Sequence, residues 1–150
     1  MERLGVSAAA DVLYTNEGKK YLDDNGFPAT VYVGLSTKKV GTQAGGEWNV
    51  TDTLADIAEN TGTSYTRKSM ARPTSTSGIR TWPETAFNVP AAGDWSANVR
   101  SFFLLTTNDG AAKVLCAVNI LAGGGPVALN SPQATVDIAA LTTFLANVWE

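Results

Sequence analysis

Apolar and polar residues alternate along several short stretches of this chain, and the alternation predicts strands. The clearest stretch is Ala29–Thr37, in which Val31, Val33 and Leu35 share one face of an extended segment and Tyr32 shares the other with Ser36. Further β-rich runs follow at residues 63–70, 85–90, 98–107, 112–120, 127–130 and 133–145.

Turn-forming sequences separate these runs and indicate how they are connected. They read AAGD (91–94), NDG (108–110), AGGGP (122–126) and NSP (130–132). Asn108-Asp109-Gly110 is the strongest of them and predicts a tight hairpin. The connections are too short for the crossover helices of a parallel sheet. The pattern therefore predicts a mainly β protein built as an antiparallel, jelly-roll-like β-sandwich.

Two segments have residues at their ends that typically start and end helices. Residues 7–25 predict an N-terminal helical segment that Ser7 caps and Gly26 ends, with a loosened region near Asn16–Gly18. Val12, Leu13, Tyr14, Tyr21 and Leu22 are expected to form its apolar stripe. Residues 51–62 predict a second, short helix, with Thr51 or Asp52 as the cap and Gly62 just beyond the end.

The second helix belongs to an insertion that separates two predicted strands. Residues 40–62 begin with a Gly-rich run, which predicts a surface loop with one large apolar residue, Trp48, inside it. We expect this insertion to act as an arm that contacts a neighbouring molecule. The rest of the 150-residue chain is expected to form one β-rich domain, since this length suffices for a single buried core.

Charge and hydropathy exclude several classes of partner. The formal net charge is −3, and no basic patch of the kind that binds nucleic acid is visible. No apolar run is long enough to span a membrane, and residues 1–12 do not resemble a signal peptide. We expect a soluble protein made in the cytoplasm. Residues 73–150 carry only 3 basic and 5 acidic side chains, which hints at an interface in that half.

Residues able to carry out catalysis are scarce. The chain has no histidine, so the commonest general base and metal ligand is missing. The carboxylates stand at predicted helix ends or in polar loops, where capping or solvation explains them. No phosphate-binding loop or nucleophile elbow is present, and Cys116 lies in an apolar run that predicts a buried side chain. We expect no enzymatic activity, no cofactor and no metal.

Large aromatic and paired basic residues are the remaining candidates for a binding role. Tryptophans in predicted loops and at the chain end either plug the ends of a sandwich, anchor contacts between subunits, or stack on carbohydrate. The basic pairs lie either on a solvated face or against an acidic neighbour. The candidate interface residues are Trp48, Trp82, Trp95, Trp149, Lys38, Lys39, Arg67 and Lys68.

The order of these features resembles a family of small tailed-bacteriophage virion proteins. The segments that carry the resemblance are ATVYVGLSTKK, TLADIAENTGTSYTRKSM and FNVPAAGDWSANVRSFFLLTTNDGAAKVLCAVNI. The corresponding family stretches look like LYVGLST, LAEV-GGGYAR, W-x-x-V-x-x-x-x-L and G-x-LL-x-x-x-L. The resemblance spans roughly residues 21–145. This chain departs from it by having ENTGTSYTRK in place of a plainer Gly-Gly-Tyr-Ala-Arg run.

The resemblance implies a β-rich component of a virion, without catalytic residues. We expect a capsid decoration (cement) protein that forms homo-oligomers and binds the outer surface of the major capsid protein lattice. The alternatives are a tail, head–tail connector or fibre-base component of the same virion, and a glycan-binding module that uses Trp48, Trp82 or Trp95. These expectations place the protein in the virion, bound to proteins, with no nucleic-acid or membrane partner.

Overall fold

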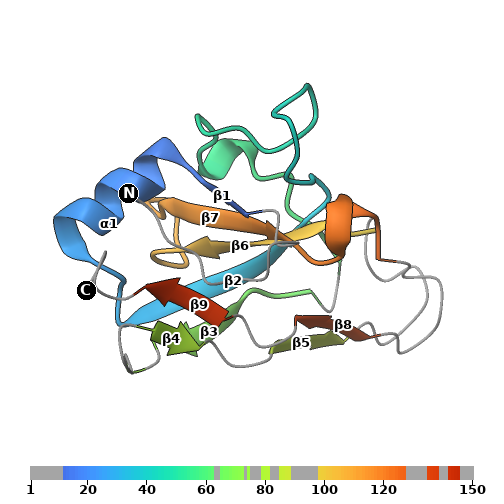
Figure 1. Cartoon of the computed structure of the whole chain (residues 1–150). Helices are drawn as coiled ribbons and strands as arrows, with labels where there is room; N and C mark the ends of the chain where they lie inside the picture. The colour runs from blue at the N-terminus through green and yellow to red at the C-terminus, as the bar shows by residue number, and fades with distance from the viewer. Residues whose placement is uncertain are drawn as a thin grey trace.

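The protein is mainly β, as the alternation predicts. The computed structural model describes residues 12–62, 65–72, 74, 79–81, 85–88, 98–127, 135–138 and 142–145 (Figure 1). Its elements are β1 (Val12–Tyr14), α1 (Asn16–Asn25), β2 (Thr30–Ser36), the 3-10 turn η1 (Leu54–Asp56), β3 (Lys68–Ala71), β4 (Ile79–Thr81), β5 (Thr85–Asn88), β6 (Ser101–Leu105), β7 (Val114–Asn119), the 3-10 turn η2 (Ala122–Gly124), β8 (Thr135–Ile138) and β9 (Thr142–Leu145).

Five of the strands form one antiparallel sheet in the order β1-β7-β6-β2-β3. β6 and β7 form the predicted hairpin, but residues 106–113 connect them, so the connection is longer than the tight turn that Asn108-Asp109-Gly110 predicts. The other strands form two antiparallel pairs, β4–β9 and β5–β8, which Figure 1 draws below the sheet. The described strands thus give one sheet and two small pairs, and the jelly-roll sandwich stays a prediction.

Side chains on the two faces of the sheet form two separate cores. β6 shows the alternation, because Phe103 faces one core and its neighbours Phe102 and Leu104 face the other. The loop-side core consists of Leu13, Val40, Trp48, Ile57, Phe103, Leu105, Ala112, Val114 and Ala117. The opposite core consists of Tyr14, Leu22, Phe27, Val31, Val33, Leu35, Met70, Val99, Phe102, Leu104, Leu115, Cys116 and Val118.

Cys116 is fully buried in the opposite core, as its apolar surroundings predict. Burial raises the pKa of its thiol to about 12, so the thiol is protonated at neutral pH. The register between β6 and β7 shifts beside it, because Leu104 pairs with Cys116 whereas Leu105 pairs with Val114. This bulge lets Leu115 and Cys116, adjacent in sequence, both enter the opposite core.

The N-terminal helix is shorter than predicted, because residues 12–14 form strand β1 instead. Leu13 enters the loop-side core and Tyr14 the opposite core, which is strand alternation. The helix starts at Asn16, and the Thr15 hydroxyl caps it by accepting a hydrogen bond of 2.9 Å from the Gly18 N–H. Gly18 does not interrupt the helix. A Cβ at this position would lie 2.3 Å from the Leu115 carbonyl oxygen, so glycine permits the helix to pack closely against the strand.

The helix predicted over residues 51–62 is wrong, since only the 3-10 turn Leu54–Asp56 forms. The Asp56 carboxylate accepts a hydrogen bond of 3.0 Å from the Thr53 N–H and closes this single turn. The next residue, Ile57, is then drawn toward the sheet, where its carbonyl accepts a hydrogen bond of 2.6 Å from the Ser36 hydroxyl. Tertiary contacts therefore override the local helix signal.

Two differences concern the later strands. Residues 79–81 lie in a stretch whose Ser, Thr, Pro and Gly content predicts a loop, yet they form β4, which pairs with β9. The run at residues 133–145 predicts one strand, whereas the structure has two, β8 and β9, with different partners. Strand pairing over long sequence distances is what local patterns do not contain.

Candidate interaction site

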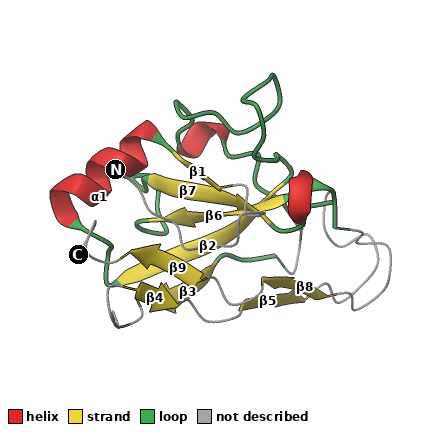
Figure 2. Cartoon of the chain, in the orientation of Figure 1, coloured by secondary structure: helices red, strands yellow, loops and turns green. Residues whose placement is uncertain are grey.

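The insertion at residues 40–62 lies against one face of the sheet, above β7 and β6 as drawn in Figure 2. Its apolar side chains Val40, Trp48 and Ile57 are buried in the loop-side core. Asn119 at the end of β7 holds the start of the insertion. Its side-chain oxygen accepts a hydrogen bond from the Val40 N–H, and its side-chain nitrogen donates one to the Val40 carbonyl, both 2.8 Å.

Trp48 is a core residue of this insertion, with a side chain that is 0% exposed. Its Nε1 donates a hydrogen bond of 2.8 Å to the Ser101 hydroxyl, and its ring centroid lies 6.1 Å from that of Phe103. The Lys38 ammonium is 5.0 Å from the indole centroid. The prediction that Trp48 anchors a contact with another subunit is therefore wrong: the loop folds back and buries the indole.

Lys38, a second predicted interface residue, makes a largely buried ion pair with Asp52. The two side chains are 14% and 11% exposed, and the Lys38 ammonium also donates a hydrogen bond of 2.9 Å to the Asp56 carbonyl. The Asp52 carboxylate in turn accepts a hydrogen bond of 3.0 Å from the Asn49 N–H. The pair connects the strand end to the middle of the insertion.

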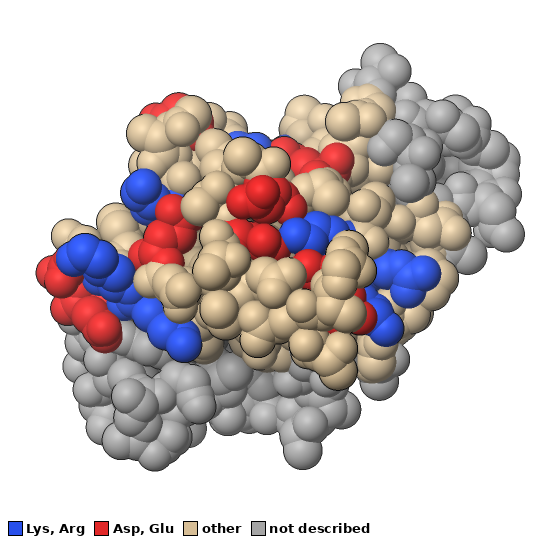
Figure 3. Space-filling model, turned by 90° about the horizontal axis from the view of Figure 1, so that it is seen from above, with Lys and Arg blue, Asp and Glu red and all other residues tan. Residues whose placement is uncertain are grey.

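The other predicted basic residues are also engaged within the chain. Lys39 lies 3.5 Å from the Glu47 carboxylate. Arg67 binds Glu59 with two hydrogen bonds, of 2.7 and 2.9 Å, and Lys68 is partly exposed and has an interaction of its own. Figure 3 shows blue and red side chains next to each other on this face. The structure does not bring these residues together as one basic surface.

Glu59 also binds Tyr65, and this contact fastens the end of the insertion to β2. The Tyr65 hydroxyl donates to Glu59 at 2.8 Å and accepts from the Leu35 N–H at 2.8 Å. Burial of the phenol, followed by the negative charge of Glu59, raises the pKa of Tyr65 above its ordinary value. These contacts give Glu59 and Tyr65 a structural role.

Between its fastened ends the insertion exposes residues 41–46, which we name the tip loop. All six residues are exposed. The Glu47 carboxylate lies beneath it and accepts hydrogen bonds from the N–H groups of Thr42 (2.8 Å) and Ala44 (3.3 Å). Burial raises the pKa of Glu47, but these hydrogen bonds and the charge of Lys39 outweigh it, so the net shift is downward. The tip loop is therefore held in one conformation.

Gln43 adds a second internal support to the tip loop. Its φ is 64°, in the left-handed region that residues other than glycine rarely adopt. Its side-chain oxygen accepts a hydrogen bond of 3.1 Å from the Val50 N–H, which holds this conformation. Gly46 has a φ of 81°, a value that glycine adopts without strain.

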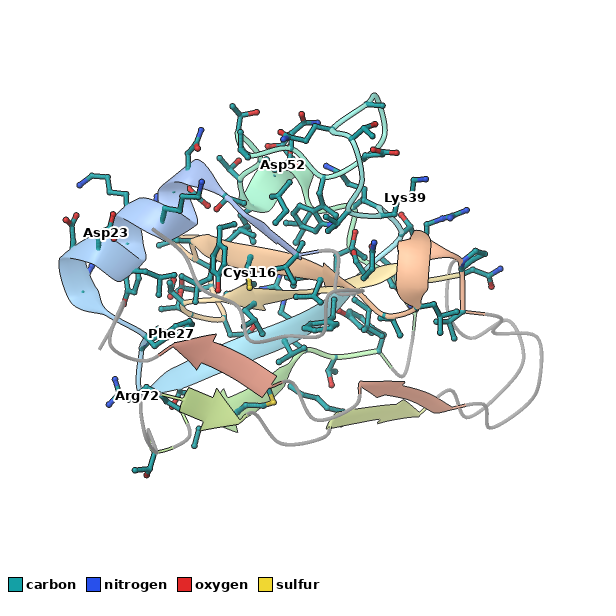
Figure 4. The ribbon with its side chains drawn as sticks, viewed as in Figure 1. Asp23, Phe27, Lys39, Asp52, Arg72 and Cys116 are labelled. Carbon is teal, nitrogen blue, oxygen red and sulfur yellow. The ribbon has the colours of Figure 1, made fainter. Side chains whose placement is uncertain are left out.

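An open hollow of about 340 Å³ lies beside the tip loop. It is lined by Val12, Leu13, Tyr14, Lys19, Val40, Gly41, Gln43 and Val50. Figure 4 shows Lys39 and Asp52 on this upper side of the molecule, with Phe27 and Arg72 at the lower left. The tip loop and the hollow share Gly41 and Gln43, so they form one continuous surface.

Three predicted interface residues, Trp82, Trp95 and Trp149, lie outside the described residues. Among the residues that the structure describes, no group of three His, Cys, Asp or Glu side chains is arranged to hold a metal ion. Within the same part of the chain, no helix has both the length and the apolar character needed to cross a membrane.

The supports of the tip loop were not identified from the sequence. Glu47, Gln43 and Ser101 act through contacts that only the fold creates. The sequence feature that indicates this loop is Gly45-Gly46, which marks a chain reversal and is followed directly by Glu47.

Comparison of the chain with protein-family models, with curated proteins and with solved structures found no match.

Proposed function

We propose that this protein is a structural component of a tailed-bacteriophage virion, and that it decorates the capsid by binding the major capsid protein lattice. The observation that carries the proposal is the tip loop, an exposed loop held in one conformation by internal bonds to Glu47 and Gln43. A binding loop ordered before contact loses little conformational entropy when it binds.

Two further features support an adhesive function. The loop belongs to an insertion that a buried indole and the Lys38–Asp52 pair attach to the sheet, so its base is anchored in the core. The sequence resemblance to small virion proteins lies on either side of the tip loop, in residues 29–39 and 53–70. A lattice offers many identical sites, which a homo-oligomer of this chain would occupy in register.

The alternatives share part of this support. A tail, connector or fibre-base component would use the same rigid loop on a different part of the virion. A glycan-binding module is less well supported, because Trp48, one of its three stacking candidates, has no exposed surface.

Copy number in purified particles separates head from tail. We expect quantitative mass spectrometry of virions from the phage that encodes this chain to give copies on the order of hundreds, in a fixed ratio to the major capsid protein. A few dozen copies or fewer would favour the tail or connector alternative. Absence from the particles would overturn the proposal.

A further inference from the structure

We infer that the tip loop is the contact surface itself, and that it binds an extended, uncharged segment of polypeptide through main-chain hydrogen bonds. The inference rests on the proposed function, in which this segment belongs to the capsid protein. It specifies both the contacting atoms and the chemistry of the partner.

The tip loop presents mainly main-chain groups to a partner. Three of its six residues are glycine and one is alanine, so a partner backbone can approach closely. In the part of the chain that the structure describes, the N–H groups of Gln43, Gly45 and Gly46 make no hydrogen bond. These exposed donors match the carbonyl groups of an extended segment.

The backbone conformation of Gln43 also supports the tip loop as the contact surface. A left-handed backbone at a residue other than glycine is strained and persists only where the surroundings enforce it. Here the Val50 N–H enforces it by donating to the Gln43 side chain. Residues held in such strained conformations cluster at functional sites such as ligand-binding loops.

The distribution of charge around the tip loop indicates the chemistry of the partner. The tip loop has no charged residue, and the basic residues that precede it in the sequence, Lys38 and Lys39, are paired with Asp52 and Glu47. Lys19 lines the hollow but is not part of the tip loop. A charged group of the partner placed against the tip loop itself would lose hydration without gaining an opposite charge. The complementary surface is therefore polar but uncharged.

The hollow beside the tip loop accommodates one side chain of that segment. Val12, Val40 and Val50 contribute to its walls, and Gln43 borders both the hollow and the tip loop. A backbone bonded to the loop would place an apolar side chain against these valines. Burial of one such side chain contributes to affinity as well as to the register of binding.

Gly45 offers a test that does not disturb the fold. A Cβ added there meets nothing within 4 Å, and its φ is not in the left-handed region. Gly45→Arg therefore places a long side chain on the contact surface without an internal clash. Gly110, in the exposed β6–β7 turn, has the same open surroundings, and Gly110→Arg is the matched control.

The experiment is co-sedimentation of purified protein with particles from a phage in which the gene is deleted. We expect the wild type and Gly110→Arg to bind and Gly45→Arg to lose at least about tenfold in affinity. Gly45→Gln tests bulk without charge and should also weaken binding. Circular dichroism and thermal unfolding confirm that each variant is folded.

The outcomes separate this inference from the proposed function. If all variants bind like the wild type, the contact lies elsewhere and the inference is wrong, while the proposed function stands. If Gly110→Arg weakens binding as much as Gly45→Arg, the effect is not specific to the tip loop and the inference also fails. If the wild type itself does not bind, the proposed function is overturned together with the inference.

Discussion

The indole Nε1 of Trp48 donates a hydrogen bond of 2.8 Å to the hydroxyl of Ser101, 53 residues away in the sequence. The same hydroxyl donates a hydrogen bond of 2.6 Å to the Lys38 carbonyl. Ser101 on β6 thus joins the segment that follows β2 to the insertion, and the Trp48 and Ser101 side chains are both buried. Trp48, which the sequence places in a predicted surface loop, attaches the insertion to the sheet.

Replacement of Trp48 by alanine should destabilise the whole protein. The substitution removes a fully buried indole and leaves a cavity between the insertion and β6, which lowers the free energy of unfolding by about 3–5 kcal/mol. Ser101→Ala removes the polar partner and should lower it by only about 1 kcal/mol. Urea unfolding followed by circular dichroism measures both. An unchanged midpoint for Trp48→Ala would contradict the assigned position of the indole.

The Lys38–Asp52 pair should couple in a double-mutant cycle. Each single variant, Lys38→Met or Asp52→Asn, leaves the other polar group largely buried without its partner and should destabilise the fold by about 3 kcal/mol. The double variant should lose less than the sum, with a coupling of about 1 kcal/mol or more. Additive losses in chemical unfolding would show that the two groups do not interact.

Acid should loosen the tip loop before the sheet unfolds. The folded-state pKa of Glu47 is below its ordinary value of 4.5, so its stabilising bonds are complete above that pH and are lost as the pH falls through the folded value. NMR amide signals of Thr42 and Ala44 should shift in that range, and Glu47→Gln should weaken these bonds at neutral pH as well. Signals in the wild type that do not respond to acid would contradict the Glu47 contact.

Alkali should leave the Tyr65 phenol protonated while the protein is folded. Burial raises the pKa of Tyr65 above its ordinary value of 10.0, so this group favours the folded state below that pH and the benefit is lost as the pH rises through the folded value. Absorbance titration should therefore show a late step on unfolding that includes the Tyr65 phenol. Tyr65→Phe should reduce the amplitude of that step by one phenol, and an unaltered titration curve would contradict the burial of Tyr65.

Strands with strict alternation were predictable from the sequence, and so was the insertion as a separate segment, whereas the contacts that fold it onto the sheet were not. Val31, Val33 and Leu35 share a core as their spacing predicts, and β6 and β7 pair as a hairpin, although through a longer connection than the predicted tight turn. Residues 12–14 were misassigned because apolar clusters of three residues fit a helix or a strand equally well. The sequence leaves three roles open for Trp48, because its partner, Ser101, lies on a strand far along the chain and only the fold brings the two together.

The pairing of charged side chains was likewise not predictable from the sequence. Lys38 and Arg67 look like solvent-facing charges in the sequence, yet Asp52 and Glu59 neutralise them across loops of the insertion. Which carboxylate meets which cation depends on how the insertion folds back on the sheet. Local sequence therefore gives the number of charges and leaves their pairing undetermined.

Averaged density of the virion decides where on the particle this protein binds. Cryo-electron microscopy of purified particles should show this protein at repeated positions on the outer face of the capsid shell, with residues 41–46 against the capsid protein. Density only at the tail or connector, or no density for this chain anywhere on the particle, would contradict the assignment as a capsid decoration protein.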